Sequence, residues 1–82
     1  MKIRTTNEVK EFEEMLDRCP DTIWAITPSG VEYNLKNTQE RDQAISLMLK
    51  DNSPEEPELY AGSYENELIV YPYILTHMPR VA

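Results

Sequence analysis

Few residues of this chain are of the types that do chemistry, and those few lie far apart in the sequence. Cys19 is the only cysteine and His77 the only histidine among 82 residues. A nucleophile needs a base within hydrogen-bond reach and a group that orients the base. The charged neighbours of Cys19 are Asp17, Arg18 and Asp21, so we expect a small core residue rather than a reactive thiol. His77 has no partner nearby in the sequence, and we expect it to be a surface histidine.

Motifs for metals, cofactors and phosphates are also missing from the sequence. The two glycines, Gly30 and Gly62, lie at expected turns and form no glycine-rich phosphate loop. No set of cysteines and histidines is suited to zinc. The acidic segment 51–58 lacks the glycine and the distal glutamate of a calcium-binding loop. We therefore expect a solvated loop there. The sequence therefore predicts no catalytic, cofactor-binding or metal-binding residue, and we expect the protein not to be an enzyme.

Binding is the chemistry that remains, and tyrosines are its candidates. Tyrosine offers a large apolar ring with a polar tip and is enriched at protein interfaces. Four of the five tyrosines lie in the last third of the chain, and at least two of them are expected to fill the core. We predict a tyrosine-rich C-terminal face that binds a protein partner or a second copy of the chain. The candidate partner-binding residues are Tyr60, Tyr64, Tyr71 and Tyr73.

The net charge separates the possible classes of partner. Fifteen acidic and eight basic residues give a net charge of −7, which disfavours direct binding to nucleic acid or to an anionic membrane. The simplest interpretation is a solubilising acidic surface on an interaction or regulatory domain. The alternative is an acidic inhibitor or nucleic-acid mimic that occupies the basic cleft of a DNA- or RNA-handling enzyme. A mimic gathers its carboxylates on one face, whereas the acids here are spread along the chain, so the mimic ranks second.

Length and composition predict one small domain, residues 1–82. The hydrophobic share of 40% and the charged share of 28% are typical of soluble domains. A single cysteine cannot form an internal disulfide, which favours a reducing compartment. The first residues lack the apolar stretch of a signal peptide, and the longest apolar run, residues 68–75, is much shorter than a membrane span. We therefore expect a cytoplasmic protein.

Capping residues and apolar periodicity predict two amphipathic helices. Thr5 followed by Glu8 has the spacing of a capping box, and Pro20 ends the first helix. Asn37 followed by Glu40 repeats this spacing at the start of the second helix. The apolar stripes are Val9, Phe12, Met15, Leu16 and Cys19 in the first helix and Ala44, Ile45, Met48 and Leu49 in the second.

A β-hairpin is predicted between the two helices, from residues 22–27 and residues 31–36. Trp24 and Ile26 are expected on the buried face of the first strand, and the second strand alternates apolar and polar residues with a period of two. The intervening turn has proline where φ near −65° is needed, followed by Gly30 where φ is positive. We therefore expect a type I turn with a glycine bulge.

The run WAITPSGVEYNLK, residues 24–36, resembles a segment of short acidic proteins of Gram-positive bacteria and their mobile elements. The resemblance covers less than half of the chain and rests on the hairpin and the capped helix that follows. It implies a helical last segment, which Pro72 argues against, and it implies no activity.

The last third of the chain allows more than one prediction. Residues 58–62 favour a short strand, and residues 68–75 are rich in β-branched and aromatic residues. Pro72 would remove a hydrogen bond from a helix interior, so we favour a strand with Pro72 at an edge or an end. Alternatively a short helix begins with Pro72, or Ser63 caps a longer helix. That longer helix would carry on one face Leu68, Tyr71 and Leu75.

The predicted fold is α+β in the order helix, strand, strand, helix, strand, strand, with two helices on one face of an antiparallel sheet. The alternative keeps this class with a helical last segment. A strand over residues 68–75 would be apolar on both faces, which predicts a dimer or a bound partner over the outer face. The predicted core consists of Val9, Phe12, Leu16, Trp24, Ile26, Val31, Tyr33, Leu35, Ile45, Met48 and Leu49.

Overall fold

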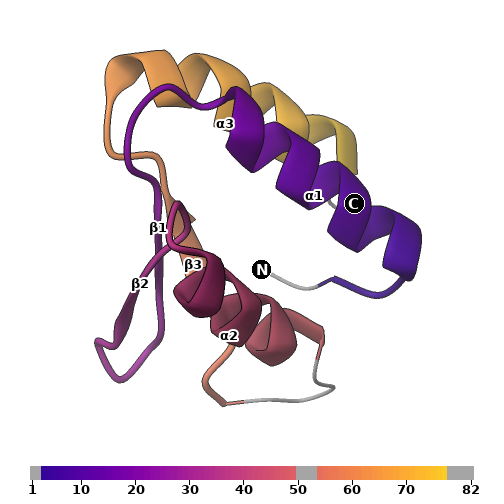
Figure 1. Ribbon diagram of the computed structural model, residues 1–82, viewed down its shortest axis with the longest axis vertical. Helices are drawn as coiled ribbons and strands as arrows, with labels where there is room; N and C mark the ends of the chain where they lie inside the picture. The colour runs from indigo at the N-terminus through magenta and orange to yellow at the C-terminus, as the bar shows by residue number, and fades with distance from the viewer. Residues whose placement is uncertain (1–2, 50–53, 78–82) are drawn as a thin grey trace.

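Three helices and three short strands follow one another along residues 3–49 and 54–77, the part of the chain that the computed structural model describes (Figure 1). The strands form one antiparallel sheet in the order β2-β1-β3. The predicted α+β class is therefore confirmed. The elements are α1 (Thr6–Arg18), β1 (Trp24–Ile26), β2 (Glu32–Asn34), α2 (Thr38–Leu49), β3 (Glu58–Tyr60) and α3 (Tyr64–His77).

Helix α1 begins at the predicted cap. The Thr5 hydroxyl oxygen accepts a hydrogen bond of 3.1 Å from the Glu8 backbone N–H. The Glu8 carboxylate in turn accepts from the Arg4 backbone N–H at 2.9 Å, one residue earlier than a capping box requires. The backbone N–H groups of Arg4 and Glu8, at the start of α1, therefore both have side-chain partners.

Helix α2 also begins at its predicted cap, and its acidic residue has a further role. The Asn37 side-chain oxygen accepts from the Glu40 backbone N–H at 3.1 Å. The Glu40 carboxylate does not return to Asn37 but accepts from the Asn34 backbone N–H, also at 3.1 Å. This bond joins α2 to the end of strand β2.

Two basic side chains join the end of α1 to the segment after β2, Lys36 from the β2–α2 connection and Arg41 from the first turns of α2. Lys36 donates to the carbonyl oxygens of Leu16 and Cys19 at 2.6 and 2.5 Å, and the Leu16 carbonyl oxygen also accepts from the Cys19 backbone N–H at 3.1 Å. Arg41 forms an ion pair of 3.2 Å with Asp17. These contacts fix where the hairpin lies relative to α1.

The turn between β1 and β2 has the predicted geometry. Gly30 donates to the Thr27 carbonyl oxygen at 2.9 Å, and Thr27 donates to the Val31 carbonyl oxygen at 2.9 Å. Gly30 has a φ of +92°, which a residue with a side chain rarely adopts. The Thr27 hydroxyl accepts from the Val31 N–H at 3.0 Å, so a side chain closes the turn as well.

The inward face of the sheet differs from the prediction. Ala25 at the centre of β1 is fully buried, and it pairs across the sheet with Tyr33 and Leu59, which pack against the core. Trp24 and Ile26 lie on the opposite, outer face and are half-buried, so their predicted place on the buried face is wrong. A small residue on the central strand lets the helices approach closely, and a strand of three apolar residues has no alternation that indicates its inward side.

The last segment is helix α3, so the predicted fourth strand over residues 68–75 is wrong and the helical alternative is confirmed. The Ser63 hydroxyl accepts from the Asn66 N–H at 3.1 Å, and the Glu67 N–H bonds the Ser63 carbonyl oxygen at 3.0 Å. Pro72 lies inside α3 on an exposed position, where water can reach the carbonyl group whose partner it removes. The burial of the inward side of α3 outweighs this local cost.

The core lies between the inner face of the sheet and the three helices. Phe12, Leu16, Leu35, Ile45 and Met48 are buried as predicted. In contrast, Val31 and Leu49 are exposed, so their predicted place in the core is wrong. Buried apolar residues that the predicted core did not contain are Ile3, Met15, Cys19, Ile23, Ala25, Ala44, Pro57, Ala61, Val70 and Tyr73.

Some predictions fall partly outside the described residues. The side chain of His77 and residues 51–53 of the predicted acidic loop lie outside them. In the described part of that loop, the Glu55 carboxylate accepts a 2.5 Å bond from Ser29 in the hairpin turn. Among the described residues, no helix is long and apolar enough to cross a membrane.

Candidate functional site

The outer face of α3 carries a row of large apolar side chains that the fold leaves exposed. We call this row, Tyr64, Leu68, Tyr71 and Leu75, the α3 stripe. The exposed fractions of these side chains are 68%, 59%, 54% and 61%. Their spacing of four, three and four residues places them on one side of a helix and is the spacing of a helix-pairing seam. Contiguous apolar surface of this kind is characteristic of interaction sites.

The opposite side of α3 explains why the stripe faces outward. Asn66, Val70 and Tyr73 share the inward side and are buried against the rest of the molecule. The Tyr73 ring lies 6.2 Å from the Phe12 ring, centroid to centroid, at an angle of 46°. Figure 1 shows α3 lying alongside α1, the helix that carries Phe12. Because α3 is apolar on two sides, packing within the chain buries only one of them.

Asn66 holds the start of α3 in place. Its side-chain N–H₂ group donates to the carbonyl oxygens of Asp21, Thr22 and Ala61 at 3.0, 3.2 and 2.6 Å. Its side-chain oxygen accepts from the Asp21 N–H at 3.2 Å. Asn66 is completely buried, so water does not compete for these hydrogen bonds. They lock α3 to the connection between α1 and β1.

Charged residues flank only one half of the α3 stripe. Glu65 and Glu67 lie in the first turn of α3, and the Tyr71 hydroxyl lies 3.4 Å from a Glu67 carboxylate oxygen. From Tyr71 to Thr76 the helix has no charged side chain. The negative charge of α3 is therefore concentrated at the N-terminus of the helix, where the helix dipole also favours it.

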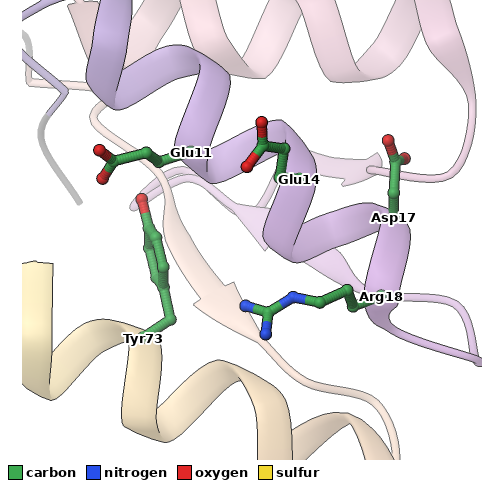
Figure 2. Close-up of a pocket in the computed structure, with 5 residues that line it drawn as sticks. All are labelled: Glu11, Glu14, Asp17, Arg18 and Tyr73. Carbon is green, nitrogen blue, oxygen red and sulfur yellow. The ribbon is translucent and has the colours of Figure 1, made fainter.

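An open groove of about 540 Å³ lies between α1 and α3 (Figure 2). The Tyr73 hydroxyl points toward the Glu11 carboxylate, and the Arg18 guanidinium reaches across from α1 toward the α3 side. Burial, with the nearby carboxylates of Glu11 and Glu8, raises the pKa of Tyr73 to about 12. A phenol with this pKa stays protonated at neutral pH, so Tyr73 is unsuited to act as a base or nucleophile. The groove is lined by Glu11, Glu14, Asp17, Arg18 and Tyr73.

The thiol of Cys19 is also held in its protonated form. Burial raises its pKa, although the positive charges of Lys36 and Arg18 act in the opposite direction. The sulfur atom lies 4.0 Å from the Met15 sulfur inside the core. The prediction of a small core residue at Cys19 is confirmed.

Comparison with known proteins identifies no relative. No family model, curated protein or solved structure matches the chain. The resemblance of residues 24–36 to short acidic proteins stays a prediction. Within residues 3–49 and 54–77, no group of three or more histidine, cysteine, aspartate or glutamate side chains is placed to hold a metal ion.

The structure separates the four tyrosines that the sequence proposed as a partner-binding face. Tyr64 and Tyr71 lie together on the α3 stripe. Tyr73 is only 5% exposed and belongs to the core. Tyr60 is 53% exposed but lies on strand β3, where it pairs with Trp24. The four tyrosines therefore form no single surface, and one of them, rather than at least two, fills the core.

The α3 stripe also contains two leucines, which the sequence-based set of partner-binding residues did not include. Leu68 and Leu75 join the tyrosines of the α3 stripe because α3 is a helix; in a strand they would have lain on opposite faces. The signal that identifies them is the four-three-four spacing of apolar residues, which the sequence contains. The local effect of Pro72 weighed against interpreting that spacing as helical.

Proposed function

We propose that this protein is a non-catalytic interaction domain that pairs with a second copy of itself through the α3 stripe. The observation that carries the proposal is the exposure of all four stripe residues, each more than half accessible, on a helix whose other side is already buried. Among residues 3–49 and 54–77, the two groups with clearly shifted pKa values, Tyr73 and Cys19, are both held protonated, which supports a role without catalysis. The buried free thiol also fits a reducing, cytoplasmic location.

The charge pattern of α3 favours a second copy in antiparallel orientation. In a two-fold antiparallel pair, Leu68 packs against Tyr71 of the partner subunit, and Tyr64 packs against the partner subunit's Leu75. Glu65 and Glu67 then face the uncharged C-terminal half of the other helix. A parallel pair would gather four carboxylates at one end and align the two helix dipoles unfavourably.

The size of the α3 stripe sets the expected strength of this pairing. Four half-exposed side chains offer a few hundred Å² per copy, below the roughly 800 Å² per partner of a stable interface. The net charge of −7 on each copy opposes association further. We therefore expect a weak dimer, with a Kd of roughly 10–100 μM.

Sedimentation equilibrium from about 1 μM to about 1 mM covers that range of Kd. The native chain should change from monomer to dimer across it, and Tyr71→Glu should remain a monomer, because it places a carboxylate in the middle of the apolar seam. Tyr60→Glu is the matched control, since Tyr60 is 53% exposed and Tyr71 54% exposed, but Tyr60 lies on the sheet. This control should dimerise like the native chain.

Two further measurements make the test decisive. Circular dichroism should show that Tyr71→Glu remains folded, and added salt should strengthen the dimer slightly by screening the like charges. A native chain that stays monomeric at about 1 mM would refute self-pairing through the α3 stripe. Dimerisation that Tyr71→Glu leaves intact would place the interface elsewhere.

A second candidate is the acidic mimic of nucleic acid. Its support is that Glu11, Glu14 and Asp17 line the groove from α1 at intervals of three residues, although Asp17 is also paired with Arg41. A mimic would bind a basic enzyme cleft with an affinity that falls steeply as salt rises. The Arg18 side chain within the same row opposes this function, so the mimic ranks second.

A further inference from the structure

The outer face of the sheet combines two aromatic rings with two carboxylates. Tyr33 and Leu59, on the other face, pack into the core beside the buried Ala25, so the residues that alternate with them face away from the helices. We call these residues the outer sheet face. They form two rows across the sheet: Asn34, Trp24 and Tyr60 in one, and Glu32, Ile26 and Glu58 in the other.

The strand register places the aromatic pair and the carboxylates side by side. Trp24 is directly opposite Tyr60, and opposed side chains in an antiparallel sheet lie about 5 Å apart. Glu58 precedes Tyr60 by two residues on the same strand and therefore shares its face. Glu32 lies across Ile26 on the other edge strand. The outer sheet face therefore carries Trp24 and Tyr60 in one row. In the next row, Glu58 lies beside Tyr60, and Glu32 lies diagonally across from Trp24.

We propose that the outer sheet face binds arginine or lysine side chains of a basic segment in a partner protein. Aromatic rings attract cations through the negative charge of their faces, and indole does so most strongly. Glu32 and Glu58 add negative charge in the row next to the two rings, and the outer sheet face contains no basic residue. The site goes beyond self-pairing, because it lies on the sheet and not on the α3 stripe.

The same charges determine which class of partner fits. Exposed aromatic residues on a sheet also stack with nucleic-acid bases, but such sites track the phosphates with basic residues. Here the charged residues on the outer sheet face are both acidic, and the chain has a net charge of −7, so phosphates are repelled. A basic peptide segment fits both the rings and the carboxylates.

The structure supplies a reporter for this binding. Trp24 is the only tryptophan in the chain, so its fluorescence observes the outer sheet face directly. The probe is a tetra-arginine peptide, with tetra-citrulline as the uncharged peptide of the same shape. Tetra-arginine should change the Trp24 emission saturably, and tetra-citrulline should not. An equal response to tetra-citrulline would overturn the role of the cation.

Two matched pairs of variants separate the site from diffuse electrostatic attraction. Tyr60→Leu keeps apolar bulk but removes the ring, and should weaken tetra-arginine binding about three- to tenfold, whereas Tyr64→Leu should not. Glu32→Gln with Glu58→Gln should weaken binding about tenfold. The double variant Glu14→Gln with Asp42→Asn removes equal charge from α1 and α2 and should have little effect.

Each contrary result has a definite meaning. Equal losses in the two charge-matched double variants would show attraction to the acidic molecule as a whole and would overturn the site. Tighter binding of an oligo-dT single strand than of tetra-arginine would assign the face to nucleic acid instead. Loss of dimerisation does not affect this test, because Tyr71→Glu should bind tetra-arginine with native affinity.

Discussion

At the scale of single residues, Asn66 contributes most to joining distant parts of the chain. Its four hydrogen bonds reach the connection before β1 and the end of the segment that contains β3. Asn66→Ala should lower the free energy of unfolding by about 2–4 kcal/mol, because it leaves several buried backbone groups without partners. Chemical denaturation measures this loss. Asn7→Ala, at an exposed position in the first turn of α1, is the control and should cost almost nothing.

The variant Asn66→Asp refines the same prediction. It keeps the size of the side chain but directs a carboxylate at three carbonyl oxygens, which disfavours the charged form. This variant should be strongly destabilised at neutral pH and should recover part of the loss near pH 4. A loss that does not depend on pH would show that the bonds of the side-chain N–H₂ group matter little.

Tyr73 should make the free energy of unfolding fall at alkaline pH. Its pKa in the folded protein is raised to about 12, above about 10 for an exposed tyrosine. The folded state therefore retains the proton more strongly, and the resulting stability is present below pH 10 and lost as pH rises toward 12, by about 2–3 kcal/mol. Unfolding free energies at several pH values test this. Tyr73→Phe should show a smaller loss over the same range, and an identical loss would assign the effect to other groups.

At the scale of elements, two glycines mark the places where the chain reverses. Gly30 and Gly62 both have positive φ, +92° and +85°. A Cβ atom at Gly30 would meet nothing within 4 Å, whereas one at Gly62 would lie 2.3 Å from the Thr22 carbonyl oxygen. Gly30→Ala should therefore cost about 1–2 kcal/mol for its backbone conformation alone. Gly62→Ala should cost clearly more, about 3 kcal/mol or above, because the backbone at Thr22, just before β1, must also move.

Thermal and chemical unfolding of the two glycine variants provide the comparison. Each substitution adds one methyl group at a positive φ, so the difference between them isolates the clash with Thr22. Equal losses would mean that the start of α3 can shift away from β1 without cost. That result would also weaken the role given to Asn66, which holds the same junction.

At the scale of the whole molecule, different chemistries occupy different elements. Helix α1 presents acidic residues beside the groove, α3 presents the apolar stripe, and the sheet presents aromatic rings with carboxylates. The two proposed sites, on α3 and on the sheet, are therefore separable by mutation. Tyr71→Glu and Tyr60→Leu serve as controls for each other, because the first should prevent dimerisation and spare tetra-arginine binding, whereas the second should weaken tetra-arginine binding and spare dimerisation. A domain with both sites can link a basic partner to a dimer.

Local signals were sufficient for several elements of this protein. The caps at Thr5 and Asn37, the apolar stripe of α1 and the turn at Gly30 depend on residues within a few positions of one another. Such short-range preferences operate whatever the rest of the chain does. The sequence by itself therefore determined the first two helices, the hairpin and the α+β class.

Tertiary packing decided the features on which the candidate sites depend. Pro72 and the β-branched residues near it favour a strand locally, but α3 forms because Asn66, Val70 and Tyr73 gain burial and hydrogen bonds only as one face of a helix. The helices likewise select the small Ala25 as the inward residue of β1. Trp24 is thereby turned outward beside Tyr60, and no local pattern indicates that arrangement, because it depends on the close approach of helices distant in sequence.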